Sequence, residues 1–536
     1  MKRTSLIHAA LLLGLTFACM GTMTAAANVA PTVRVVAAAE DDSSVRSITL
    51  HKYTSSATPN STPATGTTAD AVNVPTDSQP LQGIQFQVQR IKKVSGKTLA
   101  ASDTSSFTVD NSFTALTVTT SAAGAASAKV GTGKSADGYY LVTELSSKLV
   151  ATAAAPFIVH LPQTTKNTST GDNDLVYDVN VYPKNDLDED AVALKPQKTV
   201  QDAGGKDALA TSVMTGNYVL WNLSVTRPAD IQATADDGKV TYASQLVLAD
   251  PLISANLTYL GYDKPYFLAP DGTKTDVPVE WMTHSGDAVG NLPTDGAYQV
   301  VRFELNAAGI EKFADQPAGT KFIIPVATTV NADVNGLIKN TFDTYYKGTA
   351  TGTLVHEHSG EDAPLADGSS DTSKPTLPSS SDTSAPVVYT GNVDVAKTDE
   401  DGHALANAVF RLYPSAADAK AGTNPIKDGQ KQVLTAKTNA SGRAEFIGLQ
   451  VDPASQSQTY YLVETDAPAG YDLNGQVVKV TAKRDTIIDA TVVDHDNLWP
   501  NLPLTGTNAR LLLYAAAGVL IVIGATGVVL LKRKRA

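Results

Sequence analysis

The sequence predicts an all-β protein made of tandem immunoglobulin-like β-sandwich domains, followed by a C-terminal transmembrane helix. Short runs of β-branched and aromatic residues alternate with Gly, Asp, Asn, Ser and Pro along most of the chain. Helical periodicity is scarce before the last residues. A length of 536 residues with 42% hydrophobic residues allows three or four domains with their own cores.

Charge and composition exclude several classes of protein. The net charge is −12, and no extended basic patch occurs before the last few residues, so nucleic acid is not an expected partner. The 8 His and 1 Cys form no CxxC or HExxH pattern, so no metal and no cofactor are expected.

Residues 1–27 have the composition of a secretory signal peptide: two basic residues, an apolar stretch and small residues at the end. Cleavage after Ala27 is the first choice, and cleavage after Ala39 is the second. The only cysteine, Cys19, lies in the removed segment. The mature chain is therefore expected to be secreted and to contain no thiol, so its robustness must come from something other than disulfides.

An internal repeat divides the mature chain. The runs "SITLHKY", "GIQFQVQRI", "GYYLVTEL" and "VYDVNVYPKN" occur in the same order as "NVDVAKTD", "NAVFRLY", "TYYLVETDAPAGYDL" and "IDATVVDHDN". Two copies of one fold are thus expected to flank a middle domain with strands of its own. The expected boundaries are 40–185 for the first domain, 190–355 for the middle domain, 356–388 for a Ser/Pro-rich linker and 389–497 for the last domain.

Strand phase separates inward from outward side chains, because they alternate between the two faces of a sheet. In "VNVYPKN", one face carries Val179, Val181, Pro183 and Asn185, and the other carries Asn180, Tyr182 and Lys184. Lys184 is therefore expected to point away from the core. In the last domain Lys397, Glu464 and Asp494 are in phase with apolar residues, and buried Lys and Glu are costly unless they are paired. A buried salt bridge is the simplest interpretation of that set.

The C-terminus has three parts in a fixed order. "LPLTG" at 502–506 precedes 21 apolar residues at 511–531, which are long enough to cross a bilayer as a helix, and basic residues at 532–536 end the chain. The basic cluster favours a cytoplasmic end, which leaves the rest outside. A simple tail-anchored ectodomain would have the last two parts only.

This three-part end closely resembles the cell-wall sorting signal of Gram-positive surface proteins. "VYPKN" resembles the pilin motif, and "YYLVETDAPAGY" resembles the pilin E-box. Together, the motifs resemble those of a major backbone (shaft) pilin of Gram-positive sortase-assembled pili, also called fimbriae. The resemblance implies CnaB-like first and last domains and a CnaA-like middle domain of the fimbrial D2 type. One departure is Leu175, where the family's pilin motif usually has Trp.

The resemblance also implies how subunits are joined. A class C-type pilus sortase would recognise Leu502, Pro503, Leu504, Thr505 and Gly506 and cleave between Thr505 and Gly506. Lys184 of another copy would then accept the Thr505 carbonyl, giving an intermolecular isopeptide and a head-to-tail polymer. Further implied partners are a housekeeping sortase, a peptidoglycan precursor, minor or tip pilins and a host surface ligand of unknown identity.

Intramolecular isopeptide bonds are a second implication of the resemblance. In the middle domain it assigns Lys198 as nucleophile, Asp250 as proton relay and Asn340 as acceptor. The last domain would use Lys397 and Glu464, with Asp494 as acceptor on strand phase and Asn497 as the alternative. The first domain could use Lys52, Glu144 and Asn185. These bonds would form without an external enzyme, because an apolar site favours the neutral amine and holds the reactants together.

Two other classes of function remain open at this point. A monomeric wall-anchored adhesin would share the signal peptide, the sandwich domains and "LPLTG", but would have no need of Lys184 after Tyr-Pro. A secreted hydrolase would need a catalytic triad or nucleophile elbow, and the sequence shows neither pattern. The chain is therefore expected to be a sortase substrate, not an enzyme, and to support adhesion and colonisation.

Overall fold

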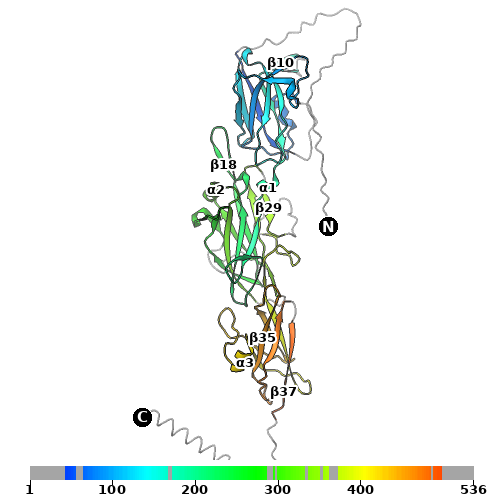
Figure 1. Cartoon of the computed structure of the whole chain (residues 1–536), viewed down its shortest axis with the longest axis vertical. Coiled ribbons are helices and arrows are strands. Elements are labelled where there is room, and N and C mark those ends of the chain that lie inside the picture. Colours follow the sequence, from blue (N-terminus) through cyan, green and yellow to red (C-terminus); the bar gives the residue numbers. More distant parts are fainter. Residues whose placement is uncertain are drawn as a thin grey trace, which may run out of the picture. The chain divides into compact units, whose positions relative to one another are not determined.

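The computed structural model describes residues 43–55, 64–166, 172–285, 294–295, 298–331, 336–350, 354–360, 372, 374–484 and 487–497. Strands dominate the described part, which confirms the all-β prediction (Figure 1). By their contacts the residues divide into two compact units. Unit 1 comprises residues 1–390 and 448–456, and unit 2 comprises residues 391–447 and 457–536, each as far as it is described.

The first part of unit 1 is a sandwich whose sheets have the strand orders β11-β1-β6 and β4-β3-β7-β8, with β5 also beside β3. The pairs β12-β2 and β10-β9 extend it. Its elements are β1 (Val45–His51), β2 (Tyr53–Thr54), η1 (Thr68–Asn73), β3 (Gln85–Lys93), η2 (Thr104–Ser106), β4 (Phe107–Val109), β5 (Leu116–Thr119), β6 (Ala125–Thr132), η3 (Lys134–Ala136), β7 (Gly138–Glu144), β8 (Phe157–Leu161), β9 (Gln163–Lys166), β10 (Asn173–Val176), β11 (Asp178–Val181), β12 (Lys184–Asn185) and α1 (Glu189–Val192).

Alternation along these strands builds the first core. In β1, Ile48 and Leu50 are buried, and in β3 the buried residues include Phe86 and Val88. These side chains join one cluster with those of β7 and β11. The first strand β1 runs parallel to the closing strand β11, so the two ends of the domain lie side by side.

The second part of unit 1 has two larger sheets of orders β14-β13-β16-β26-β21-β22 and β23-β25-β19-β28-β29, with β20 beside β26 and β24 beside β25. Its elements are β13 (Gln197–Gln201), β14 (Asp207–Ala208), β15 (Ala210–Ser212), β16 (Tyr218–Thr226), η4 (Ala229–Ile231), β17 (Gln232–Thr234), β18 (Val240–Tyr242), β19 (Gln245–Ile253), β20 (Leu257–Tyr262), β21 (Tyr266–Leu268), β22 (Lys274–Asp276), η5 (Val279–Trp281), β23 (Met282–His284), β24 (Thr294–Asp295), β25 (Tyr298–Leu305), α2 (Ala307–Ala314), β26 (Lys321–Val330), β27 (Leu337–Lys339), β28 (Asp343–Lys347), β29 (Val355–His358) and β30 (Val387–Tyr389).

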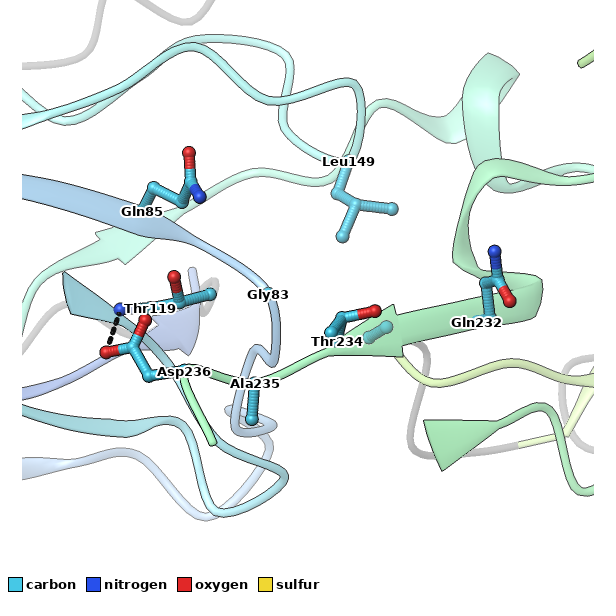
Figure 2. A pocket seen from close by; sticks show the side chains of 9 residues that line it. Gly83, Gln85, Thr119, Leu149, Gln232, Thr234, Ala235 and Asp236 are labelled. Atoms are coloured by element: carbon cyan, nitrogen blue, oxygen red, sulfur yellow. Dashed lines mark hydrogen bonds between the residues drawn. The ribbon is translucent and has the colours of Figure 1, made fainter. Parts of the chain in front are cut away.

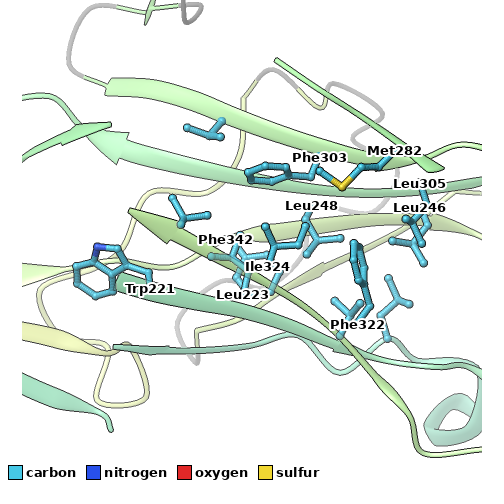
Figure 3. Packing of buried hydrophobic residues seen from close by; sticks show 14 of the residues in the cluster. Trp221, Leu223, Leu246, Leu248, Met282, Phe303, Leu305, Phe322, Ile324 and Phe342 are labelled. Carbon is cyan, nitrogen blue, oxygen red and sulfur yellow. The ribbon is translucent and has the colours of Figure 1, made fainter. Parts of the chain in front are cut away.

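A second hydrophobic core lies between those two sheets. Leu223 and Ile324 come from one sheet, and Leu248 and Phe303 come from the other. Figure 3 shows these side chains between the strands, with Trp221 at one end of the group. In the described residues of unit 1, each sandwich therefore has a main core of its own, and a smaller buried cluster around Val247 and Tyr345 lies in the second sandwich.

The expectation of a free linker over 356–388 is wrong at both ends of that segment. Strand β29 pairs with β28 in the second sandwich, and β30 pairs with β15 and β27. Asp382 and Ala385, which lie between β29 and β30 in the sequence, are both buried. The Ser, Pro and Asp content suggested a linker, but Val387 and Val388 are β-branched residues that complete a small sheet.

Unit 2 is a sandwich with strand order β33-β32-β35-β36-β31-β34 and with β37 beside β31. The parallel pairing of β31 with β37 repeats that of β1 with β11. Its elements are β31 (Gly391–Asp399), β32 (Val409–Tyr413), α3 (Ala416–Ala421), β33 (Thr435–Lys437), β34 (Arg443–Leu449), β35 (Ser457–Asp466), β36 (Val478–Lys483) and β37 (Ile487–Asp494).

A hollow of about 470 Å³ lies in unit 1, between the β3–β5 edge and the β17–β18 hairpin. Figure 2 shows the Thr119 N–H donating to Asp236 Oδ2 at its rim, with a distance of 2.7 Å. Asp236 is the one carboxylate among the residues that line it, and this hydrogen bond already occupies it. The residues that line this hollow therefore do not bring several titratable groups together.

Candidate functional site

Three buried lysines mark the candidate sites, one in each sandwich. Lys52 and Lys397 are 0% exposed and Lys198 is 3% exposed. Each ammonium lies within 4.0 Å of a buried carboxylate. Each also lies about 6 Å from the centre of an aromatic ring, at 5.9 Å from Phe86, 5.7 Å from Trp221 and 6.0 Å from Phe410. Strand phase had predicted an inward position for Lys397, and the resemblance had assigned Lys52 and Lys198 to the same kind of site.

The first-domain site consists of Lys52, Glu144 and Asn185. Lys52 Nζ donates to Glu144 Oε2 at 2.8 Å and to Asn185 Oδ1 at 2.5 Å. Asn185 Nδ2 in turn donates to Glu144 Oε1, which closes a ring of hydrogen bonds. Burial lowers the pKa of Lys52, although the interaction with Glu144 opposes this effect. The amine thus lies against the amide oxygen of the expected acceptor, with a carboxylate contacting both.

The last-domain site consists of Lys397, Glu464 and Asp494. Lys397 Nζ lies 3.2 Å from Glu464 Oε1 and donates to Asp494 Oδ1. The Asn474 N–H donates to the other oxygen of Glu464, at 2.9 Å, and fixes the carboxyl group in place. Burial raises the pKa of Glu464, although the hydrogen bond from Asn474 and the charge of Lys397 oppose this effect.

Strand register relates these two sites to each other. In the first domain Asn185 pairs with Thr54, two residues after Lys52. In the last domain Asp494 pairs with Asp399, two residues after Lys397. The carboxylates also correspond, since Glu144 pairs with Phe86 and Glu464 pairs with Phe410, the rings beside the two lysines.

Asp494 is therefore the counterpart of Asn185 by register as well as by strand phase. The alternative acceptor Asn497 is exposed, and its N–H donates to Gly470 O in the loop that follows β35. The structure brings Asp494 to Lys397 and leaves Asn497 at the surface.

Two glycines help to position these lysines, and sequence reasoning missed both. The Lys52 and Lys397 N–H groups donate to the carbonyls of Gly124 and Gly442, which have φ angles of 71° and 69°. A Cβ atom at Gly442 would lie 2.5 Å from Lys397 O, and one at Gly124 would clash in the same way with Lys52 O. Glycine is required at both positions by conformation and by space. The signal in the sequence was a Gly just before each following strand.

The middle-domain site consists of Lys198, Asp250 and Asn340. Lys198 Nζ lies 2.6 Å from Asp250 Oδ2 and donates to Thr341 O at 3.1 Å. Asn340 is fully buried, and neither atom of its amide makes a hydrogen bond of good geometry among the described residues. Burial lowers the pKa of Lys198 to about 8 and raises the pKa of Asp250. Both shifts favour a neutral amine beside a protonated carboxyl group.

Lys184 differs from these three lysines. It begins β12, is half-buried, and pairs across the sheet with Tyr53. Among the described residues, its ammonium makes no hydrogen bond and no ion pair. Desolvation lowers its pKa without an opposing partner. Its neighbour Asn185 is buried, so two consecutive side chains point to opposite faces as predicted.

The burial of Asn180 differs from the predicted strand phase. This residue was expected on the outward face with Tyr182 and Lys184, but it is 5% exposed. Its N–H donates to Gly66 O, so the segment that leads into η1 covers this end of the strand. The outward face is thus partly enclosed near Asn180 and more open near Lys184.

Several predicted features lie outside the described residues. They are the signal peptide 1–27, the sorting motif from Leu502 to Gly506 with Thr505, the apolar span 511–531 and the basic tail 532–536. Where the chain is described, no helix is long and apolar enough to span a membrane. Within the same residues, no group of three or more His, Cys, Asp or Glu side chains is arranged to hold a metal ion.

Comparisons with known proteins agree with the motifs. Residues 43–186 match the Gram-positive pilin subunit D1 N-terminal domain, residues 391–496 match a prealbumin-like fold domain, and residues 500–536 match the LPXTG cell wall anchor motif. Fimbrial subunit type 2 of Actinomyces naeslundii is 28% identical over 74% of this chain and 70% of its own length. Fimbrial subunit type 1 of Actinomyces viscosus is 25% identical over 74% and 73%. The full-length major pilin SpaD of Corynebacterium diphtheriae is 21% identical, with a TM-score of 0.39 over 85% of this chain and 98% of that one.

The fold and the anchor motif define the class first: a cell-wall-anchored surface protein built from β-sandwich domains. The pilin D1 domain at its start narrows this class. The pilin D1 domain and the anchor motif support a pilin subunit of Gram-positive bacteria with a C-terminal sorting signal, in a surface pilus anchored in the cell wall. The LPXTG motif implies processing by a sortase, and the family predicted from the three motifs is confirmed.

Proposed function

We propose that this chain is the shaft subunit of a covalent pilus, polymerised through an isopeptide bond between Lys184 of one subunit and Thr505 of another. A pilus sortase of the class C type forms a thioester with the Thr505 carbonyl and releases the segment that begins at Gly506. The neutral amine of Lys184 attacks this carbonyl, the C–S bond breaks, the sortase thiol leaves, and the amine gives up one proton. One lysine and one sorting signal per subunit produce a linear polymer.

The environment of Lys184 supports this role. An amine that attacks a thioester must be unprotonated and accessible, and Lys184 is half-buried, has a lowered pKa and lacks a recorded ion pair among the described residues. The buried lysines could not serve instead, because their side chains are enclosed in the cores. This contrast between Lys184 and the three core lysines is the observation that carries the proposal.

The core lysines form internal isopeptide bonds in this proposal. Lys52 joins Asn185 and Lys198 joins Asn340, each with loss of one ammonia, while Lys397 joins Asp494 with loss of one water. Glu144, Asp250 and Glu464 relay the protons, since each lies within 4.0 Å of its lysine. Enforced proximity of this kind can supply effective molarities of about 10⁵ M or more, so no further catalyst is needed. The chain acts on itself only and is otherwise a sortase substrate, not an enzyme.

Replacement of Lys184 tests the polymer. Lys184→Ala and Lys184→Arg should give a folded, wall-linked monomer and remove the high-mass ladder from wall extracts. The matched control is Lys129→Ala, which removes an exposed lysine from β6 of the same domain and should leave the ladder intact. A ladder of normal length in the Lys184 variants would show that another lysine is the acceptor.

A monomeric wall-anchored adhesin is the second candidate function. It would give the same single wall-linked species for the wild-type chain and for Lys184→Ala. The proposed pilus also supports adhesion and colonisation, through accessory tip pilins or through the shaft itself.

A further inference from the structure

The outward face beside Lys184 carries an ordered network. Because β1 and β11 pair in parallel with one constant register, His51 lies opposite Tyr182 and Tyr53 lies opposite Lys184. The His51 and Tyr182 rings are stacked, with centroids 4.5 Å apart and planes at 11°. A stack between neighbouring strands restricts both rings.

Asn180 fixes this stack from one side. His51 Nε2 donates to Asn180 Oδ1 at 2.8 Å, and Asn180 Nδ2 donates to Asp178 O at 3.1 Å. The Asn180 N–H donates to Gly66 O at 2.8 Å. The orientation of the His51 ring is therefore set by a buried residue that has little freedom of its own.

The stack lies on the same face of the strand as Lys184. Tyr182 precedes Lys184 by two residues on the same face, and Pro183 between them fixes the backbone φ angle. A lysine side chain is otherwise a long flexible stem, so bulky rings on the same face, at Tyr182 two residues before it and at Tyr53 opposite it, would restrict its path and remove water from it. The half-burial of Lys184 agrees with rings placed in this way.

We propose that His51, Asn180 and Tyr182 are positioning residues that hold the Lys184 amine extended and partly desolvated for attack on an acyl donor. This inference rests on the proposed function of Lys184, and it adds to Tyr182 of "VYPKN" two residues outside those five, His51 and Asn180. His51 and Asn180 act through Tyr182, and none of the three exchanges atoms with the substrate. The other titratable groups near the stack are Tyr53 across the sheet and Asp70, whose carboxylate accepts the Thr65 and Gly66 N–H groups.

Chemical acetylation tests the positioning without a sortase. The full chain is purified from cells that lack the pilus sortase, pulsed with acetic anhydride at a series of pH values, and analysed for acetylation of Lys184 relative to exposed Lys129. His51→Ala and Tyr182→Ala should slow acetylation of Lys184 near pH 8 by about threefold or more and move its pH profile upward, because each unit of pKa changes the free-amine fraction tenfold. Tyr182→Phe keeps the stack and should react like the wild-type chain.

A matched control is available in the same domain. His160 and Tyr139 also have ring centroids 4.7 Å apart, on strands β8 and β7, and His160 is exposed. His160→Ala should leave the acetylation of Lys184 unchanged. Unchanged pH profiles in both His51→Ala and Tyr182→Ala would overturn the inference, and so would an equal loss in Tyr182→Phe.

Polymerisation provides the second readout. In cells with the sortase, His51→Ala and Tyr182→Ala should lengthen the time needed to form the ladder, while Tyr182→Phe and His160→Ala should not. If the wild-type chain forms no ladder but the acetylation profiles shift as expected, the proposed polymer fails and the positioning of Lys184 stands. If the ladder requires Lys184 but neither readout responds to His51 or Tyr182, the polymer stands and the positioning fails.

Discussion

Glu464→Gln is the sharpest test of the internal bond in the last domain. The change preserves the volume of the side chain but removes a group that can relay a proton between Lys397 and Asp494, which are 97 residues apart in sequence. The mature wild-type chain should weigh one water less for this bond than its sequence requires. The Glu464→Gln variant should not lose this water, because without the proton relay Lys397 and Asp494 remain a buried ion pair and form no amide.

The expected loss of stability follows from the size of the closed loop. A cross-link across about 100 residues restricts the unfolded chain by about 4.7 kcal/mol on the chain-entropy model. For a domain of about 100 residues this corresponds to a fall in melting temperature of roughly 20 °C or more. Scanning calorimetry and resistance to trypsin measure this effect. Glu445→Gln, which changes an exposed carboxylate on β34, is the control and should alter neither mass nor melting temperature.

Asp494→Asn provides a second variant with the opposite outcome. An amide at this position makes it chemically equivalent to Asn185, and its reaction with Lys397 releases ammonia in place of water. The product is the same amide, so the final mass should equal that of the reacted wild-type chain. Asn497→Ala should also keep the bond. A wild-type chain of full uncorrected mass would refute the reasoning and favour a buried ion pair, whereas loss of the bond in Asn497→Ala would show that Asn497 is the acceptor in place of Asp494.

Two further predictions concern the middle domain and the positioning glycines. Asn340→Ala leaves Lys198 unreacted with a pKa of about 8, below the ordinary 10.5, so the unfolded state binds more protons between these values. Its free energy of unfolding, measured with denaturant, should therefore rise from pH 8 to pH 10.5, and a flat profile would contradict a desolvated amine. Gly442→Ala should destabilise the last domain by about 1–3 kcal/mol and slow bond formation, because the new Cβ atom clashes with Lys397 O. Gly402 has a φ angle of 82° and open space around it, so Gly402→Ala should show only the smaller effect of backbone conformation. Mass spectrometry and thermal melting compare the two variants, and equal effects would contradict the clash.

The sequence could predict the inward residues because phase depends on local alternation alone. Lys52, Lys198 and Lys397 each share a face with apolar residues, and the structure buries all three. What alternation could not supply was register. Whether Asp494 or Asn497 approaches Lys397 depends on the pairing of β31 with β37, which are separated by most of the domain.

The remaining differences between the sequence predictions and the structure come from tertiary contacts. Asn180 is buried because a distant segment around Gly66 covers an otherwise outward face. The segment 356–388 contains residues typical of linkers, yet β30 within it completes a sheet with strands from two other parts of unit 1. Neither contact leaves a periodic signal in the sequence itself.

The covalent path through the chain predicts which internal bonds bear load. In the proposed polymer, tension would enter at Lys184 and leave at Thr505, so it would run through residues after 184 and bypass most of the first domain. A Lys397–Asp494 bond would carry the tension past the chain between these two residues, because they lie close to the two ends of the last domain. The Lys52–Asn185 bond would instead protect the strand that presents Lys184.

Single-molecule pulling between Lys184 and Thr505 tests this division. Glu464→Gln should add a length of about 330 Å, the extended span of the 97 residues that the bond encloses. Glu144→Gln removes the relay of the first domain and should add no length, although it should lower that domain's melting temperature. Equal extension in the two variants would mean that load does not follow the path between Lys184 and Thr505, and the proposed linkage would have to be sought at another lysine.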